Sequence, residues 1–378
     1  MKKIALLGST GSIGVQTLNV VRANPQKFKI VSLSAGANAN LLKEQVAEFS
    51  PAVATLSACP DWISDFPSTE FFFGENSFTN AVIESADIVV VALVGFKGII
   101  AVLKAIEMGK DIALANKESL VVGGELVMRL AKEKGVNIYP IDSEHSAIWQ
   151  ALSQDYSKPF SKIILTASGG AFRDLTKEQL SCVTASDALK HPNWAMGAKI
   201  TIDCASMVNK AFEVIEAKWL YNTTFDKIDV IVHRESIIHS MVEYNDGSVI
   251  AQMSYPSMEL PIALALCPNE RLSSSVKSLD FSALKSLTFA PLDRDKYPCF
   301  DLVVNAGKAG GCLPAVANGA NEIAVKLFLE NKISFNDIYK AISSALDSYN
   351  GKCEGTFDCY QNADTYARDF VKEWFKVR

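Results

Sequence analysis

Three carboxylates in this sequence have the residue types and spacing of ligands for a hard divalent cation: Asp142, Glu144 and Glu213. Asp142 and Glu144 follow an apolar segment and lie two residues apart, so in an extended chain their side chains would point to the same side. Glu213 lies near the start of an expected helix, where Lys210 shares its face. Mg²⁺ and Mn²⁺ prefer such oxygen ligands and keep positions for water or substrate. Taken singly, each carboxylate also fits a surface or helix-cap role, so their convergence is a hypothesis.

A glycine-rich turn, "GSTGSIG", follows the first apolar segment and places Gly8, Gly11 and Gly14 before a helical pattern. Glycines allow a tight turn there and let backbone N–H groups approach a pyrophosphate at the helix N-terminus. The second strand ends in residues 34–38, "SAGAN", without the Asp or Glu that binds the ribose 2′-OH of NAD. The sequence therefore favours NADP, with Lys43 as a candidate cation for its 2′-phosphate.

Two strand ends carry further polar residues. Lys117 in "ANKES" follows an apolar strand, at the edge where ligands bind in open α/β sheets, although a solvated loop lysine is an equal alternative. Ser168 and the two glycines after it in "TASGGAF" have the composition of an anion cradle.

A second polar cluster, "ASMVNKAFE", places Asn209 and Lys210 close to a helix start, which suits a phosphate. The stretch "KHPNWAMGAK" fits neither a helix nor a strand and is interpreted as a lid near 187–198, or else as a surface loop with one buried Trp. Cys204 has no base beside it in the sequence, so a buried thiol is the favoured interpretation over a nucleophile.

The elements that must position these residues change along the chain. Up to residue 142, β-branched runs alternate with helical patterns, which predicts βαβ units and a parallel sheet. The next segment mixes strands with helices at 205–220 and 258–267, and "NDGS" signals a hairpin. The remainder is helical. We expect an α/β protein with a Rossmann-like parallel sheet (1–142), a central α+β catalytic domain (143–267), a linker (268–300) and a C-terminal helix bundle (301–378).

The composition excludes several classes of function. The 378 residues are 49% apolar and 21% charged, with a net charge of −5, which gives no footprint for nucleic acid or an anionic membrane. Eight scattered cysteines without a CxxC pattern indicate reduced thiols. No targeting segment or spanning apolar run is recognised, so we expect a cytoplasmic protein with no membrane or nucleic-acid partner.

Several motifs together resemble one family. "GSTGSIG", "ANKESLV", "DSEHSAI", "SGGAFR", "HPNWAMGAKITID", "NKAFEVIEAKWL" and "ESIIHSMVEYNDGSV" are similar, in order, to the 1-deoxy-D-xylulose-5-phosphate reductoisomerases. The resemblance runs from Met1 to the C-terminal helices. It implies an NADPH- and Mg²⁺- or Mn²⁺-dependent homodimer that rearranges and reduces its phosphorylated substrate to 2-C-methyl-D-erythritol 4-phosphate, in isoprenoid precursor biosynthesis.

The resemblance also implies roles for individual residues. The metal ligands would be Asp142, Glu144 and Glu213, and the catalytic residues would be these three with Lys117 and His191. Substrate contacts would come from Lys117, Ser143, Glu144, Ser168, His191, Trp194, Asn209, Lys210, Glu213 and His239. Cofactor contacts would come from Gly8, Thr10, Gly11, Ser12, Ile13, Gly14, Gly36, Asn38, Asn116, Glu118, Met196 and Gly197.

The sequence departs from the family pattern at two positions. Ala37 stands where the family often has Lys near the 2′-phosphate, and Cys204 stands where it often has Ser in the phosphate pocket. A thiol is a weaker donor than a hydroxyl, so we expect a loss on the order of 1 kcal/mol at that contact. Two alternatives stay open: an oxidoreductase of the aspartate-semialdehyde dehydrogenase type, which needs a Cys–His pair, and a non-catalytic NADP sensor.

Overall fold

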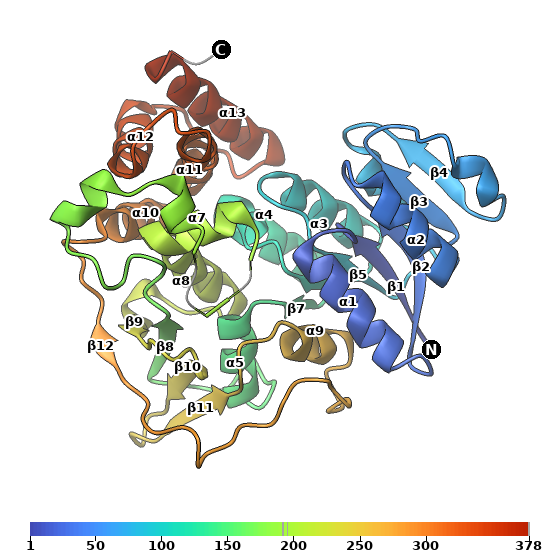
Figure 1. Cartoon of the computed structure of the whole chain (residues 1–378), viewed down its shortest axis with the longest axis horizontal. Helices are drawn as coiled ribbons and strands as arrows, with labels where there is room; N and C mark the ends of the chain where they lie inside the picture. The colour runs from blue at the N-terminus through green and yellow to red at the C-terminus, as the bar shows by residue number, and fades with distance from the viewer. Residues whose placement is uncertain (191–192, 195, 377–378) are drawn as a thin grey trace. The chain divides into compact units, whose positions relative to one another are not determined.

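The computed structural model describes residues 1–190, 193–194 and 196–376, and its chain forms two compact units (Figure 1). The N-terminal unit comprises residues 1–119, 127–146 and 257–277. The C-terminal unit comprises residues 120–126, 147–256 and 278–378. Among the described residues, every helix is too short or too polar to cross a lipid bilayer.

A parallel sheet forms the centre of the N-terminal unit. Its seven strands within the described residues lie in the order β4-β3-β2-β1-β5-β6-β7. Since β1 pairs with β2 on one side and with β5 on the other, the strand order reverses at β1, the usual place for a ligand in such sheets. The strands are β1 (Lys2–Leu7), β2 (Phe28–Ser34), β3 (Val53–Leu56), β4 (Glu70–Phe73), β5 (Ile88–Val91), β6 (Asp111–Leu114) and β7 (Ile138–Pro140).

Helices follow most of these strands, as βαβ connections require. They are α1 (Ser12–Ala23), α2 (Ala39–Phe49), α3 (Lys97–Glu107) and α4 (Glu118–Lys134), with short 3₁₀ turns η1 (Ile63–Asp65) and η2 (Ser77–Ala81). Residues 120–126 of α4 belong to the C-terminal unit, and the helix bends at Gly123, whose φ of −137° lies outside the helical range. The helix α5 (Ser143–Ala151) begins directly after β7.

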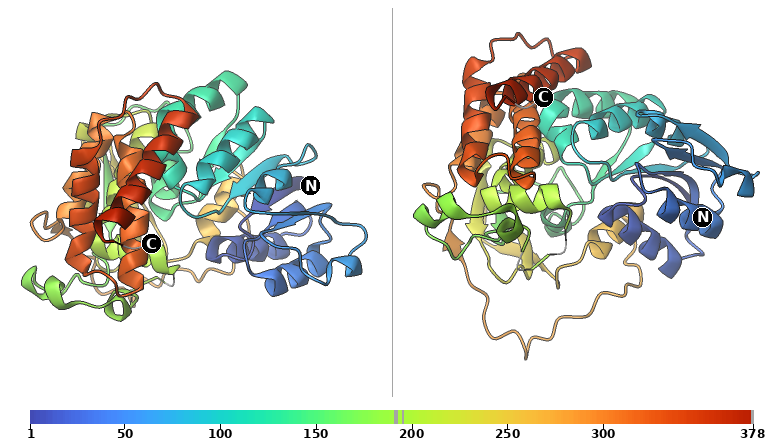
Figure 2. Two further views of the ribbon diagram at one scale, coloured as in Figure 1. Left: turned by 90° about the horizontal axis from the view of Figure 1, so that it is seen from above. Right: turned by 45° about the horizontal axis from the view of Figure 1, so that its top comes forward.

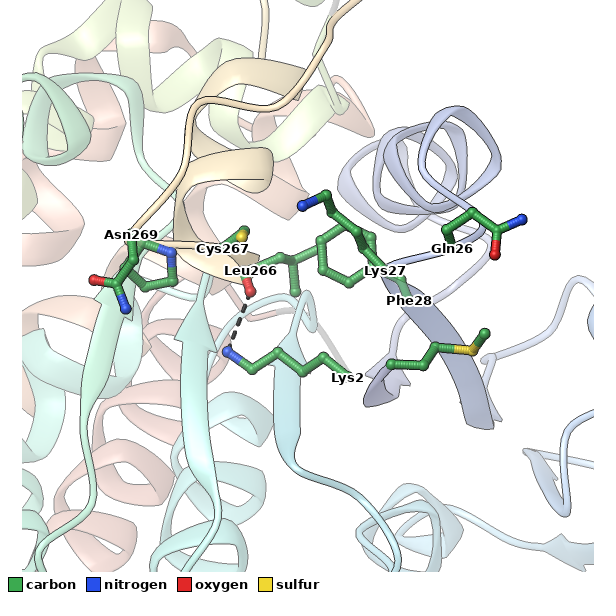
Figure 3. Close-up of a pocket in the computed structure, with 9 residues that line it drawn as sticks. Lys2, Gln26, Lys27, Phe28, Leu266, Cys267 and Asn269 are labelled. Carbon is green, nitrogen blue, oxygen red and sulfur yellow. Dashed lines mark hydrogen bonds between the residues drawn. The ribbon is translucent and has the colours of Figure 1, made fainter.

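The helix α9 (Glu259–Leu266) completes the core of the N-terminal unit, beside α1. Ile262, Ala265 and Leu266 are buried in the same apolar cluster as Ile4 and Leu6 of β1. The expectation that this helix belongs to the central domain is therefore corrected: its apolar face fits the parallel sheet. The Lys2 ammonium donates to the Leu266 carbonyl at 3.1 Å, at the C-terminal end of α9 and beside a pocket of about 360 Å³ (Figure 3).

A mixed sheet and a group of helices form the C-terminal unit (Figure 2). The sheet order is β11-β10-β8-β9-β12; β8 and β9 are parallel and the other pairs antiparallel. The expected hairpin joins β10 to β11, with Gly247 at φ +83°. The strands are β8 (Lys162–Ala167), β9 (Ile228–Val232), β10 (Ile238–Glu243), β11 (Val249–Met253) and β12 (Ala290–Pro291).

The helices of this unit include a C-terminal group in which α11 packs against both α12 and α13. The set is α6 (Ala185–Ala188), α7 (Ala198–Ser206), α8 (Val208–Leu220), α10 (Pro298–Ala309), α11 (Leu313–Leu329), α12 (Phe335–Ser348) and α13 (Phe357–Trp374), with η3 (Glu178–Cys182) and η4 (Phe225–Lys227).

The expected fold class is confirmed, and the differences lie in single elements. The sequence prediction left β3 and β4 unassigned, because neither is as rich in β-branched residues as the equally short β5. The single helix expected at 205–220 is divided into α7 and α8 by Met207, whose φ is +64°. The helix α10 begins inside the predicted linker, because Pro298 is well suited to a first helical turn. The domain boundaries at 142 and 300 remain a proposal, whereas residues 257–277 belong to the N-terminal unit.

The Gly14→Ala variant tests the packing of the glycine turn. A Cβ at Gly14 would lie 2.2 Å from the Gly8 carbonyl oxygen, so the turn must distort. We expect the free energy of unfolding to fall by about 1–3 kcal/mol. Gly36→Ala is the matched control, because a Cβ there meets nothing within 4 Å. Equal denaturant midpoints for the two variants would contradict this account of the turn.

Candidate active site

The glycine turn lies between β1 and α1, at the switch point of the parallel sheet. Gly8 has φ +87°, and a Cβ there would lie 2.4 Å from the Ala92 carbonyl oxygen that follows β5. The N-cap of α1 is Gly11, with extended backbone and no side-chain cap. The first N–H groups of α1, which come from the candidate residues Ser12, Ile13 and Gly14, can therefore serve a phosphate.

The second group of candidate cofactor contacts lies at the start of α2. Asn38 is the N-cap of this helix and accepts from the Leu41 N–H at 3.2 Å, while Gly36 is exposed. Lys43 forms an ion pair with Asp65 at 2.7 Å. The predicted cation for a 2′-phosphate is thus engaged with a carboxylate of the N-terminal unit.

The Asn116 side chain connects the loops that follow the neighbouring strands β5 and β6. Its Nδ2 donates to the Leu93 and Gly95 carbonyls after β5, both at 3.0 Å, and to the Glu118 carboxylate at 2.9 Å. Its Oδ1 accepts from the Ser119 N–H at 3.0 Å. Since these bonds use both ends of the side chain, Asn116 fixes the loop that carries Lys117.

Asp142 is the N-terminal cap of α5. Its Oδ1 accepts from the Glu144 N–H at 3.0 Å, the His145 N–H at 3.2 Å and the His145 ring Nδ1 at 2.9 Å. The expectation that Asp142 and Glu144 share one side of an extended strand is therefore wrong, because Asp favours the cap position and starts a helix there. Glu144 lies in the first helical turn, where its carboxylate accepts from the Ser143 hydroxyl.

The other Asp142 oxygen, Oδ2, lies 3.0 Å from the Lys117 ammonium. The two side chains are only 8% and 11% exposed, so the pair is shielded from water. Removing one partner of a buried ion pair leaves an uncompensated charge, at a cost of about 3–5 kcal/mol. The structure thus joins two of the predicted site residues directly, and His145 is a third member that the sequence prediction missed. In the sequence, His145 could have been found from its position three residues after an Asp that caps a helix.

In the C-terminal unit, α8 carries the third predicted carboxylate. Glu213 is 1% exposed and accepts from Asn209 Nδ2 at 2.6 Å and from the Lys210 ammonium. The predicted Lys210–Glu213 helix pair is therefore present. Asn209 and Lys210 were expected at a phosphate, whereas here their side chains bind the carboxylate.

The loop after β8 brings the predicted anion cradle beside α7. Gly169 and Gly170 have φ of +84° and +69°, and the Gly170 N–H donates to Ser168 Oγ at 3.2 Å. A Cβ on Gly170 would lie 2.5 Å from the Cys204 carbonyl oxygen, so the loop contacts the half-buried Cys204 closely.

Two residues from the segment before α10 hold this loop, and the sequence prediction missed both. Tyr297 donates to the Gly169 carbonyl at 3.2 Å, and Lys296 donates to the Phe172 carbonyl at 2.8 Å. Burial raises the pKa of Tyr297 and lowers the pKa of Lys296. The neutral phenol therefore remains a donor at physiological pH.

The remaining candidates lie around β10 and the expected lid. His239 Nε2 is 2.9 Å from Ser254 Oγ, and the Trp194 ring centroid is 6.0 Å from that of His239. Met196 is half-buried, and Gly197 is the N-cap of α7. His191 lies outside the described residues, as do Pro192 and Ala195 of the expected lid.

Comparisons with known proteins cover the whole chain. Family models described as "1-deoxy-D-xylulose 5-phosphate reductoisomerase" match residues 4–124, and two C-terminal domain models of the same enzyme match 138–221 and 253–370. A relative of that name from Geobacillus kaustophilus is 48% identical, over 98% of this chain and 99% of its own. The chain belongs to the 1-deoxy-D-xylulose 5-phosphate reductoisomerase family. Another relative of that name, from Geobacter metallireducens, is 46% identical over 99% of both.

Solved reductoisomerase structures share this fold. One, described as DOX-P reductoisomerase in complex with NADPH, fosmidomycin and magnesium, has a TM-score of 0.93 and 37% identity, covering 100% of this chain and 98% of that one. The reductoisomerase from Zymomonas mobilis in complex with NADPH has a TM-score of 0.90 and 36% identity, with full coverage of both chains.

The Asn116→Ala variant tests how this reductoisomerase-family chain positions Lys117. It leaves the Leu93 and Gly95 carbonyls without their donor, so we expect a loss of about 1–3 kcal/mol in unfolding free energy. A lower kcat should accompany this loss. The matched control is Asn137→Ala, at the exposed start of the β7 segment, where the side-chain amide donates to the Asp111 carboxylate at 3.1 Å. Wild-type stability and kcat in Asn116→Ala would refute the assignment.

Proposed function

We propose that this chain catalyses the NADPH- and divalent-metal-dependent conversion of 1-deoxy-D-xylulose 5-phosphate to 2-C-methyl-D-erythritol 4-phosphate. The observation that carries the proposal is the family match, which extends over nearly the whole length of both this chain and its relatives. Solved members of the family with NADPH, magnesium and fosmidomycin have the same fold.

The N-terminal unit has the features that NADPH binding needs. The glycine turn is packed so tightly that a Cβ at Gly8 or Gly14 would collide with backbone, as in the tight turn of a dinucleotide-binding site. The end of β2 carries no carboxylate that would repel a 2′-phosphate. We assign cofactor contacts to the ten candidate residues of this unit, from Gly8 to Glu118, and to Met196 and Gly197.

The donor set also fits a hard cation. Asp142, Glu144 and Glu213 offer carboxylate oxygens, the ligands that Mg²⁺ and Mn²⁺ prefer. We propose that these three residues bind the metal. When bound, the metal supplies Lewis-acid polarisation of substrate oxygens, and NADPH supplies the hydride.

The chain's own residues orient the reactants. Asp142 and Asn116 fix Lys117, whose ammonium would stabilise negative charge that develops on substrate oxygen. We assign the substrate phosphate to Ser168 and its glycine loop, together with Asn209 and Lys210. Held at that end, the substrate would present its reacting carbons in one orientation, which lowers the entropic part of the barrier.

Further substrate contacts are assigned to the helix start and the lid. Ser143 and Glu144 begin α5, and His239 and Trp194 lie beside each other in the C-terminal unit. We propose that Trp194 and His191 cover the substrate and exclude water from the reacting groups.

We further propose a cytoplasmic homodimer. The edge strand β11 exposes Val249 and Ile250, each at 48%, and an apolar edge strand is normally covered. All eight cysteines are free, which suits a reducing compartment.

The two alternative functions are not favoured. A semialdehyde dehydrogenase mechanism needs a Cys–His pair, and the family match over the whole chain is to reductoisomerases instead. A non-catalytic NADP sensor would have no need of the buried Lys117–Asp142 pair.

The Glu213→Gln variant tests the metal assignment. We expect substrate-dependent NADPH oxidation with Mg²⁺ or Mn²⁺ to fall at least about 100-fold, since the metal's contribution is worth several kcal/mol. NADPH affinity, measured by fluorescence titration, should stay unchanged. Glu133→Gln, on the exposed face of α4, is the control. Wild-type turnover in Glu213→Gln would exclude Glu213 as a ligand.

The Ile250→Glu variant tests the proposed dimer. A charge on β11 should prevent the β11 edges of two copies from pairing. Sedimentation equilibrium should then give the monomer mass of 41.1 kDa. Phe281→Glu is the control, because Phe281 is 69% exposed in an irregular segment that is not part of the sheet. A wild-type chain that already sediments as a monomer would remove the dimer proposal.

A further inference from the structure

Three thiols gather where the α12–α13 loop meets the start of α11, apart from every residue assigned above. Cys312 is the N-cap of α11 and is 3% exposed. Cys353 lies in the loop and packs against Gly311, where an added Cβ would lie 3.4 Å from the Cys353 Cβ and 3.9 Å from its sulfur. Cys359 lies in the first turn of α13.

Cys359 has the surroundings of a reactive thiolate. Its sulfur accepts from the Thr356 hydroxyl at 3.2 Å and from the Glu354 N–H at 3.4 Å. These hydrogen bonds lower the pKa of Cys359. The side chain is half-buried, and the N-terminal end of the 18-residue helix α13 adds a favourable dipole.

Cys353 lies in the loop before α13, six residues before Cys359. Glu354, whose N–H donates to the Cys359 sulfur at 3.4 Å, directly follows Cys353, so the loop brings the Cys353 backbone close to that sulfur. Cys312 differs, because burial and the neighbouring Cys353 raise its pKa to about 12, which keeps it a protonated thiol. The cluster thus contains an activated thiol at Cys359, a second thiol at Cys353 in the preceding loop, and an inert thiol at Cys312.

We propose that Cys359 is a site of modification by peroxides and that Cys353 converts the oxidised product into an intrachain disulfide. The Cys359 thiolate attacks one oxygen of hydrogen peroxide; the O–O bond breaks, and hydroxide leaves and takes a proton to form water. Sulfur is oxidised to sulfenic acid and the peroxide is reduced. The Cys353 thiol then attacks the sulfenic sulfur, an S–S bond forms, the S–O bond breaks, and a second water leaves.

This modification is independent of the proposed catalytic function. It closes a short loop at the start of α13, the helix that packs along α11. The residues assigned to NADPH, metal and substrate lie on other elements, so the disulfide marks exposure to oxidant without consuming an active-site group.

The test treats the full-length protein with hydrogen peroxide at neutral pH and maps disulfides by peptide mass spectrometry. We expect a linked Cys353–Cys359 pair and an intact-mass loss of about 2 Da. Before oxidation, iodoacetamide should alkylate Cys359 at least about tenfold faster than the exposed Cys59. Dithiothreitol should reverse the mass change.

Serine variants separate the roles of the three thiols. Cys359→Ser should abolish the linkage, Cys353→Ser should stop oxidation at the sulfenic acid, and Cys312→Ser and Cys59→Ser should leave the linkage intact. A melting curve for each variant checks that it folds. A disulfide that maps to Cys312, a linkage that survives in Cys359→Ser, or a Cys359 that stays reduced would overturn the proposal.

Discussion

A nearly buried carboxylate must be compensated by hydrogen-bond donors, and the donors to Asp142 within the described residues include at least four. Two are backbone N–H groups at the start of α5, one is the His145 ring, and one is the Lys117 ammonium. Lys117 in turn sits on a loop that Asn116 ties to the end of β5. The charge at Asp142 therefore depends on the ends of three parallel strands being in register, which is what the sheet provides.

In the C-terminal unit, the buried carboxylate of Glu213 is compensated in a different way. Glu213 accepts from two residues of its own helix, Asn209 and Lys210. Both carboxylates are paired with a lysine. Each lysine therefore compensates the charge of a carboxylate that would otherwise be buried alone.

The elements with strong periodicity could be predicted from sequence, and those that tertiary packing decides could not. The glycine turn, the helix pair Lys210–Glu213 and the hairpin at Gly247 depend on neighbouring residues and were predicted correctly. The strands β3 and β4 lack the run of β-branched residues that marks the equally short β5. The cap at Asp142 was read as extended chain, because the competing helix start depends on a single residue. Whether α9 belongs to the N-terminal or the C-terminal unit depends on which sheet buries its apolar face. The hydrophobic period of the helix does not contain this information.

The return of the chain to the N-terminal unit at α9 has a consequence for synthesis on the ribosome. The parallel sheet is complete by residue 140, yet Ile262, Ala265 and Leu266 of its core emerge only after much of the C-terminal unit has been made. At translation rates of about 5–20 residues per second, the nascent sheet waits on the order of 10 s with an uncovered apolar face. During that interval the half-made chain is a client for chaperones, so slow translation through residues 147–256 would promote its aggregation.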